Sequence, residues 1–453
     1  MIIALLARFA ALLAALALLG APAFAQGPLR VDVTDGHLDP MPVAIPDFIG
    51  ADGRAADAGA QIARVINNNL GNTGLFTPVD SDAFIETIEN IDLRPRFGDW
   101  RVINAQALLT GRVTIDGEDR MQIAFRLWDT ATEQQLLGLQ FATTPDNWRR
   151  IAHKVSDAVY ERLTGEQGYF DSRIVYVAES TGADGQTLRR LAVMDQDGAN
   201  PSLLTDRSFM ALLPNYSPGA QQITFVAQRE DGRNMSYLYD LATGRRESLF
   251  EGGGPSISAG GQSLAPRFAP DGRSLLVAAE RHGSHHIFRY DLRSRILRQI
   301  TSHPADDVSP SPAPDGTQIV FSSNRSGRSQ LYVMDADGAN VRRITFGEGQ
   351  YYAPAWSPRG DLVAFVRQQS GGRFALGVVR ADGSGGERIL YEGYFVDSPT
   401  WAPNGRILAF TRGDFDRDGT QYSIWSVDLA GFNLRRLPTQ GAASDPAWSP
   451  LIE

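Results

Sequence analysis

The residues best able to do chemistry are few and scattered. The only histidine cluster is His282-Gly283-Ser284-His285-His286, whereas His37, His153 and His303 are isolated. Neighbouring residues of a strand point to opposite faces, so His285 and His286 are poorly arranged to share one metal ion. We therefore interpret the cluster as part of a hairpin loop and the isolated histidines as surface residues. We expect no catalytic metal.

A second candidate is the acidic stretch Asp414-Phe415-Asp416-Arg417-Asp418-Gly419, which imitates the opening of a calcium-binding loop. Such a loop needs a bidentate glutamate at its twelfth position, and that position is Trp425, within an apolar stretch typical of a strand. The pattern favours the polar tip of a hairpin.

Covalent catalysis has little support. The chain contains no cysteine, which excludes thiol nucleophiles, thiolate metal sites and disulfides, and it contains no G-x-S-x-G sequence of a hydrolase. The formal net charge of −9 disfavours nucleic acid and anionic lipid as partners. These absences exclude cysteine chemistry and count against a hydrolase.

The first residues have the features of an export signal. Arg8 supplies a positive charge, Phe9 to Leu19 is almost continuously apolar, and Ala23-Phe24-Ala25 fits a cleavage site. We expect residues 1–25 to be removed as a signal peptide. No other stretch is long and apolar enough to cross a bilayer, so the mature chain is expected to have no transmembrane segment.

The strongest signal is a repeated phrase in the second half of the chain. Its best copies are Ala353-Pro354-Ala355-Trp356-Ser357-Pro358 and Ser398-Pro399-Thr400-Trp401-Ala402-Pro403, and its leading prolines are Pro214, Pro266, Pro310, Pro354, Pro399 and Pro446. A period of roughly 40–50 residues with several strands per unit is typical of a β-propeller. Six copies predict six blades, and we expect the prolines to flank the innermost strand of each blade.

The two ends of this repeat predict how the ring closes. The last copy stops at Pro450, whereas strand-like segments without a copy, such as residues 173–178 and 191–195, precede the first. We therefore predict that the N-terminal strands of the propeller pair with the C-terminal blade, which leaves no exposed sheet edge.

Residues 26–165 lack the repeat and predict an α/β domain. Strands are expected at 29–33, 43–48, 107–114, 121–128 and 135–142. A helix is expected at 58–70 with Gly71 as its stop, and another from Thr144-Pro145 to Gly165. The predicted fold is thus an N-terminal α/β domain with a mobile N-terminal tail, then an all-β, six-bladed propeller over residues 170–453.

These features together resemble the TolB family, the periplasmic component of the Tol–Pal system of Gram-negative bacteria. The resemblance covers nearly the whole mature chain. It rests on the proline repeats, on Leu331-Tyr332-Val333-Met334-Asp335, on Asn72-Thr73-Gly74-Leu75-Phe76, and on the ending Arg435 to Pro438 and Pro446 to Pro450.

The resemblance implies a non-enzymatic adaptor with two partners. The lipoprotein Pal would bind at the mouth of the propeller channel, on residues just ahead of the repeat prolines: Gln262, Leu264, Ala265, Val308, Ser309, Tyr352, Ala353, Asp397 and Ser398. A histidine is common in the family near the place of Gln262. The inner-membrane protein TolA would recognise the tail, with Gln26, Leu29, Arg30, Val31, Asp32 and Val33 as its contacts.

The resemblance also implies roles in outer-membrane constriction during division and in envelope integrity, and further partners among bacteriocins and other envelope lipoproteins. We expect channel occupancy to alter the order of the tail. We expect no cofactor, with calcium in an acidic channel as the alternative. The alternative function is carbohydrate binding in the periplasm, with Tyr351 and Tyr352 as exposed aromatic residues on the channel face.

Overall fold

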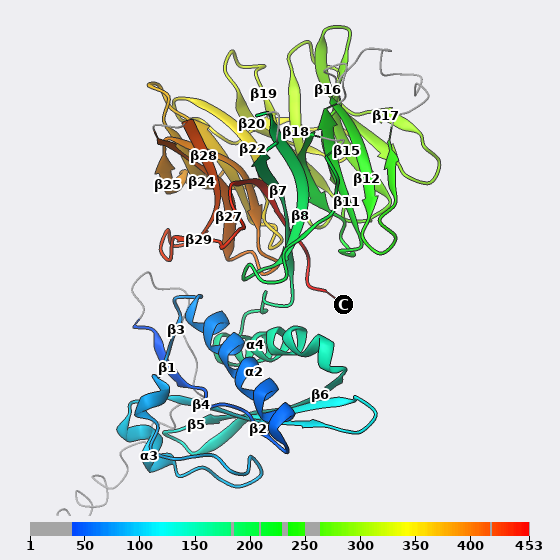
Figure 1. Ribbon diagram of the computed structural model, residues 1–453. Helices are drawn as coiled ribbons and strands as arrows, with labels where there is room; N and C mark the ends of the chain where they lie inside the picture. Colours follow the sequence, from blue (N-terminus) through cyan, green and yellow to red (C-terminus); the bar gives the residue numbers. More distant parts are fainter. Residues whose placement is uncertain are drawn as a thin grey trace, which may run out of the picture.

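The computed structural model describes residues 39–182, 185–207, 210–228, 234–249, 263–416 and 419–452. The expected signal peptide, the tail residues Gln26 to Val33 and Gln262 lie outside these ranges. The chain forms two domains joined by a short linker, with the propeller above the α/β domain in Figure 1.

The N-terminal domain is a mixed sheet with two helices on the face toward the propeller (Figure 1). The sheet order is β3-β1-β4-β5-β6, with β2 added beside β4. Pairs β1–β3 and β1–β4 are parallel, and β4–β5 and β5–β6 are antiparallel. The strands are β1 (Met41–Ala44), β2 (Ile49–Gly50), β3 (Phe76–Pro78), β4 (Ala107–Ile115), β5 (Met121–Asp129) and β6 (Gln134–Thr143).

The first long helix, α2 (Gly53–Gly71), begins where a side chain caps it. Asp52 Oδ1 accepts a hydrogen bond from the amide of Ala55 at 2.8 Å, which satisfies one of the free amides of the first turn. Gly71 was expected to stop the helix, but it is the last helical residue, and Asn72 is the cap. The expected strand at 43–48 is also shorter: β1 ends at Ala44, close to Pro46, which has no amide to donate.

The second long helix, α4 (Trp148–Thr164), follows a short 3-10 turn, η2 (Pro145–Asn147). It ends at Gly165, whose φ of 75° is the left-handed conformation that glycine adopts without strain. The predicted apolar face is buried at Ile151, Val155, Val159 and Leu163. Two short helices, η1 (Ser81–Ala83) and α3 (Phe97–Val102), were not predicted; α3 brings Trp100 into the core.

The propeller consists of six four-stranded antiparallel sheets, as the repeat predicts. The first five are formed by β10 (Met210–Tyr216), β11 (Gln222–Gln228), β12 (Asn234–Asp240) and β13 (Arg246–Ser248); β14 (Ser263–Phe268), β15 (Ser274–Arg281), β16 (Ser284–Asp291) and β17 (Leu297–Gln299); β18 (Asp307–Pro312), β19 (Gln318–Ser323), β20 (Gln330–Asp335) and β21 (Arg342–Arg343); β22 (Gln350–Trp356), β23 (Leu362–Gln368), β24 (Phe374–Arg380) and β25 (Arg388–Gly393); and β26 (Phe395–Trp401), β27 (Ile407–Asp416), β28 (Gly419–Asp428) and β29 (Arg435–Arg436).

The sixth sheet combines strands from both ends of the propeller. Its order is β30-β7-β8-β9, with strands β30 (Ala443–Trp448), β7 (Arg173–Thr181), β8 (Thr187–Asp195) and β9 (Ser202–Leu203). In the antiparallel pair β30–β7, Trp448 lies opposite Ile174 and Ala443 opposite Ala178.

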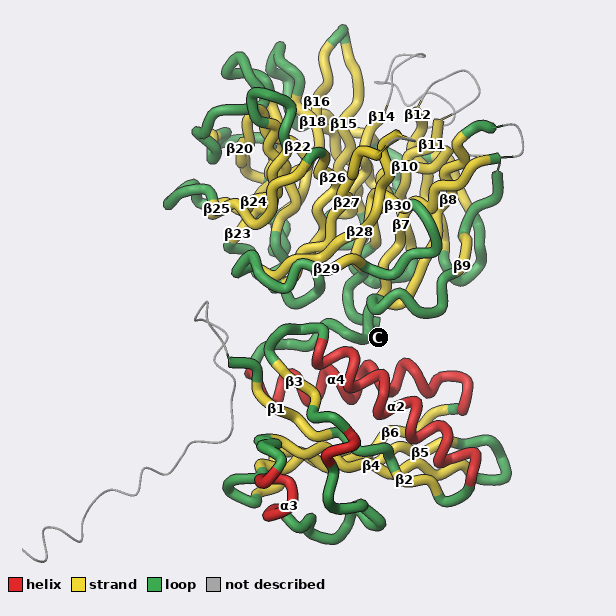
Figure 2. Tube along the Cα trace, turned by 60° about the vertical axis from the view of Figure 1, so that its left-hand side comes forward, coloured by secondary structure: helices red, strands yellow, loops and turns green. Residues whose placement is uncertain are grey.

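The two domains share one hydrophobic cluster. It runs from the N-terminal sheet through α2 and α4 to Tyr169 and Trp448, whose rings lie edge to face with centroids 5.9 Å apart. The linker is fixed on α4, because Asp157 accepts hydrogen bonds from the amides of Phe170 at 2.7 Å and Asp171 at 2.9 Å. Figure 2 shows the C-terminal segment ending between the domains, where Ile452 accepts a hydrogen bond from Arg150 at 2.7 Å.

Candidate functional site

The repeated prolines create a bulge in the innermost strand of every blade. The pairing register of all six inner strands shifts across the proline, as between Tyr352 and Ala355 in β22. We expected the prolines to flank these strands, but they lie within them, where a bulge tolerates the missing amide. The residue before the proline has a positive φ of 45–52° in five blades, at Leu213, Ser309, Ala353, Ser398 and Asp445.

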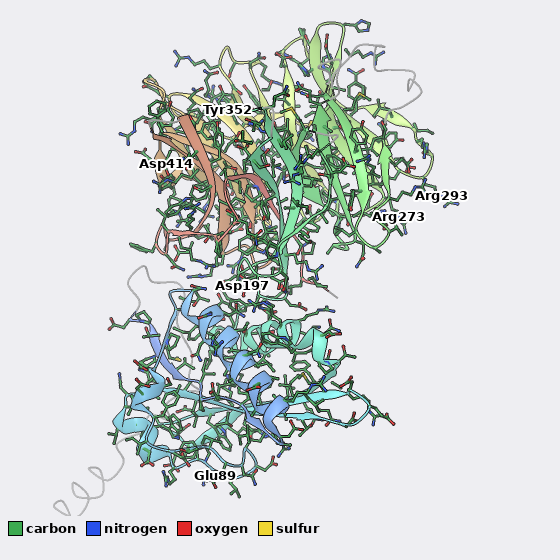
Figure 3. The ribbon with its side chains drawn as sticks, viewed as in Figure 1. Glu89, Asp197, Arg273, Arg293, Tyr352 and Asp414 are labelled. Carbon is green, nitrogen blue, oxygen red and sulfur yellow. The ribbon has the colours of Figure 1, made fainter. Side chains whose placement is uncertain are left out.

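These bulges surround one cavity of about 300 Å³ inside the channel, which we call the upper cavity. Five of the residues predicted to bind Pal line it: Ser309, Tyr352, Ala353, Asp397 and Ser398. Figure 3 shows Tyr352 within the propeller, in the half away from the N-terminal domain. The inner strands thus bring together residues that lie far apart in the sequence.

The remaining predicted rim residues have other positions. Val308 lies half-buried in β18 and does not line the cavity. Leu264 and Ala265 belong to β14, where Leu264 pairs with Ala278, but their side chains are not described. Gln262 and the TolA-binding residues lie outside the described ranges. The assignment of all these residues to partner binding stays a prediction.

Two carboxylates dominate the electrostatics of the upper cavity. Burial and the neighbouring Asp445 raise the pKa of Asp397 to about 6. Burial also raises the pKa of Asp445, although Ser398 Oγ donates a hydrogen bond to Asp445 at 2.8 Å and the amide of Leu213 donates another at 3.3 Å. Asp445 was missed in the sequence, yet it precedes Pro446 as Ser398 precedes Pro399, so the repeat could have identified it.

The channel widens toward the N-terminal domain into a second cavity of about 520 Å³, which we call the vestibule. The turns that follow the inner strands, the linker residue Gln167, and Pro450 and Leu451 contribute to its wall. Five aromatic side chains also line it: Tyr216, Phe268, Trp356, Trp401 and Trp448. Arg267 is a basic residue that lines both cavities.

Tyr351 does not lie on the channel face as expected. It is fully buried, and its hydroxyl donates a hydrogen bond to Glu387 at 2.7 Å. Its neighbour Tyr352 lines the upper cavity, because successive residues of a strand point in opposite directions. One of the two aromatic residues that supported carbohydrate binding is therefore part of the core.

The histidine cluster and the acidic stretch both belong to hairpins. The cluster is mostly strand rather than loop: β16 begins at Ser284, His285 bonds with Asp306 at 3.1 Å, and His286 is buried. The acidic stretch continues β27 as far as Asp416, and β28 begins at Gly419. Asp414 lies at the outer side of the propeller in Figure 3 and pairs with Arg412 at 2.9 Å.

In the part of the chain that the structure describes, one group has the spacing of a metal site: His153, Asp195 and Asp197, whose ligand atoms lie within 4.8 Å of one another. His153 is buried rather than on the surface, and burial lowers its pKa to about 4. Arg149 already pairs with both carboxylates, with its Nε 3.4 Å from Asp195 and an ion pair to Asp197.

This group belongs to a polar contact between the domains, visible at Asp197 in Figure 3. Asn69 Nδ2 donates to His153 Nδ1 at 3.0 Å and to Ser156 at 2.9 Å, and Asn69 Oδ1 accepts from Gln196 at 3.0 Å. We call this set the interdomain seam; its members are Asn69, Arg149, His153, Ser156, Asp195, Gln196 and Asp197. The seam joins the domains.

Among the described helices, none combines the length and apolar character needed to cross a membrane. Comparison with known proteins gives a consistent result over most of the chain. Residues 29–136 match the family model described as the TolB amino-terminal domain, and residues 160–452 match the TolB beta propeller domain.

A solved structure of TolB from Acinetobacter baumannii is 26% identical, with a TM-score of 0.75, covering 91% of this chain and 96% of that one. A putative TolB from Agrobacterium tumefaciens is 18% identical, with a TM-score of 0.37, covering 60% of this chain and 90% of that one. The hydrazine synthase of Kuenenia stuttgartiensis is 14% identical, with a TM-score of 0.48, covering 62% of this chain and 47% of that one. The last two likenesses add nothing to the assignment.

The two domain matches, in the same order as the two folded units, cover most of the chain, and the bacterial structure matches both units together. The chain belongs to the TolB family.

Proposed function

We propose that this protein is a non-enzymatic periplasmic adaptor that binds Pal at the mouth of the propeller channel and TolA through its N-terminal tail. Through these contacts it would support outer-membrane constriction during division and the integrity of the envelope. Bacteriocins and other envelope lipoproteins are further candidate partners. The family membership supports the general role.

The observation that supports the Pal site is the convergence of five predicted rim residues on one cavity. All six blades contribute to this wall, and in five of them the residue before the repeat proline lines it: Leu213, Ser309, Ala353, Ser398 and Asp445. A binding surface made of equivalent positions on several rigid sheets is pre-organised, which lowers the entropic cost of association.

A crosslinking experiment in whole cells tests the Pal site. A photoreactive phenylalanine analogue placed at Tyr352 keeps an aromatic ring in the upper cavity, and we expect it to form an adduct with Pal. The same analogue at Arg293, on an outer turn in Figure 3, is the matched control and should form none. Equal labelling from both positions, or none from Tyr352, would contradict the proposal.

A pair of variants tests the separation of the two partner sites. Deleting Gln26 to Asp35 should abolish TolA binding and spare Pal binding, because the tail is proposed to contact TolA alone. Replacing Ala265 by glutamate should weaken Pal binding and spare TolA binding. Loss of both partners in either variant would refute two independent sites.

We further propose that Pal at the channel mouth changes the order of the tail. The support is the continuous hydrophobic cluster through both domains and the fixed linker, which give a physical route between the two surfaces. Limited proteolysis of the tail, with and without saturating Pal, measures this coupling. An unchanged cleavage rate would contradict it.

A further inference from the structure

The six repeats place one residue each at the level where the vestibule meets the upper cavity. It is the residue directly after the repeat proline, and all six line one cavity or both: Asn215, Arg267, Ser311, Ala355, Thr400 and Ala447. Apart from Arg267, the five residues of this ring are uncharged. Arg267 is therefore the only charged member of this ring, and its side chain is the longest.

Arg267 has no charged partner among the described residues, unlike Arg325 and Arg367 in the propeller. Arg325 pairs with Asp307 at 2.7 Å, and Arg367 pairs with Glu387 at 3.3 Å. Burial lowers the pKa of Arg267 to about 10, with no nearby carboxylate to oppose the effect. Arg267 is half-buried in the cavity wall. A guanidinium partly withdrawn from bulk water without a counter-charge is costly, and it offers several donors to an anion.

The two sides of Arg267 differ in charge. The upper cavity also contains Asp397 and Asp445, which repel an anion that enters from that side. The vestibule wall on the other side includes no acidic residue among the described ones. An anion is therefore favoured to reach Arg267 from the vestibule.

The vestibule suits a ligand with an apolar body. The indole nitrogens of Trp356, Trp401 and Trp448 already donate to Gly360, Ala355 and Ser172 at 2.9–3.0 Å, so their rings offer apolar surface to the cavity. The cavity volume of about 520 Å³ lies within the range of small-molecule sites.

We propose that the vestibule binds a small organic carboxylate, with the carboxylate on the Arg267 guanidinium and the apolar body against the aromatic wall. Arginine is suited to this role because its planar fork binds a carboxylate through two parallel hydrogen bonds. The vestibule adjoins the upper cavity proposed for Pal and shares Asn215, Arg267 and Thr400 with it, but the proposal does not depend on the binding of Pal or TolA.

Titration calorimetry with a matched pair of probes tests this site. We expect 4-phenylbutyrate to bind the purified protein at least about tenfold more tightly than its uncharged amide, since a hydrogen bond to a charged group adds that much affinity. The Arg267→Gln variant should bind the two probes equally. Arg267→Lys should keep part of the preference, because lysine retains the charge but not the fork.

A second variant keeps the test decisive if Arg267→Gln does not fold. Asn215→Asp places a carboxylate in the same ring, where it can pair with Arg267, and should abolish the preference for the acid while leaving amide binding unchanged. Asp397→Asn, in the upper cavity, is the control that should not weaken acid binding. The proposal is overturned if neither probe binds, if acid and amide bind equally to the unaltered protein, or if Arg267→Gln keeps the preference.

Discussion

The interdomain seam and the channel contain the same kinds of polar side chain. The two regions differ in how many of these side chains have a hydrogen-bond or ion-pair partner. In the seam, the buried Asn69 uses its amide on His153, Ser156 and Gln196, and Arg149 faces two carboxylates. In the channel, Asp397 accepts a single hydrogen bond, from the amide of Ser398, and Arg267 has no polar partner among the described residues. Most polar groups of the seam therefore have a partner within it, whereas Arg267 in the channel has none among the described residues.

This difference distinguishes polar groups that are buried to hold the fold together from polar groups that are buried to bind a ligand. A buried polar group costs free energy unless it is paired, so a paired network can persist as part of the fold alone. An unpaired group at a cavity wall keeps its ability to bind a ligand, at a cost to stability. We therefore expect substitutions in the seam to destabilise the protein. Substitutions of the poorly paired channel groups, Asp397 and Arg267, should instead alter binding, with stability unchanged or increased.

The largest expected effect is in the seam. Asn69→Ala should lower the free energy of unfolding by about 3 kcal/mol, because it leaves buried groups of His153 and Gln196 without partners. Urea unfolding measures the change. The control is Asn68→Ala on the exposed side of α2, which should change stability by less than about 0.5 kcal/mol. A loss below about 1 kcal/mol for Asn69→Ala would contradict the conclusion that the paired groups of the seam stabilise the fold.

The next effect has the opposite sign and depends on pH. The pKa of Asp397 is about 6 in the folded protein, above the value of about 3.9 for an unfolded chain. Ionising Asp397 therefore opposes folding: the cost is absent below about pH 4, grows as the pH rises, and is complete above about pH 6. Asp397→Asn should thus stabilise the protein by about 2 kcal/mol at pH 7.

Urea unfolding of both proteins at pH 4 and pH 7 tests this expectation. The difference in stability should be close to zero at the lower pH and favour Asp397→Asn at the higher one. If Asp397→Asn is less stable than the unaltered protein at pH 7, the ionised carboxylate of Asp397 has favourable partners in the channel. That result would contradict the contrast between the seam and the channel. Asp445 titrates beside Asp397, so the transition will be broader than that of a single group.

The sequence predicted the architecture well because its signal is repeated. Six prolines at similar intervals predicted six blades, and the same register brought Ser309, Ala353 and Ser398 to one cavity. The bulge itself could not be predicted from a proline alone, since an edge position would also tolerate the missing amide. The same repeat also contains Asp445 and Arg267. Their importance could be recognised only from the cavities that they line and from the partners that each of them has or lacks.

The wrong predictions, for His153 and Tyr351, concern contacts that a local sequence pattern does not reveal. His153 was expected on the surface as an isolated histidine, and it does lie off the predicted apolar face of α4. The opposite side of α4 is buried against the propeller, and the partner that fixes His153, Asn69, lies 84 residues away. Tyr351 was placed on the channel face together with Tyr352, although the alternation of a strand permits only one of them there.

The smallest expected effect compares two positions of the same repeat within the channel. Ser398 and Ser309 both precede a repeat proline and both have φ of 52°, but only Ser398 has a side-chain hydrogen bond among the described residues, to Asp445. Ser398→Ala should lower the free energy of unfolding by about 1 kcal/mol, because Asp445 loses a donor that helps to hold its charge. Ser309→Ala should change it by less than about 0.5 kcal/mol. Urea unfolding at pH 7 measures both changes. Equal losses would mean that backbone strain at the bulge, rather than the hydrogen bond of the hydroxyl, determines stability at these two positions.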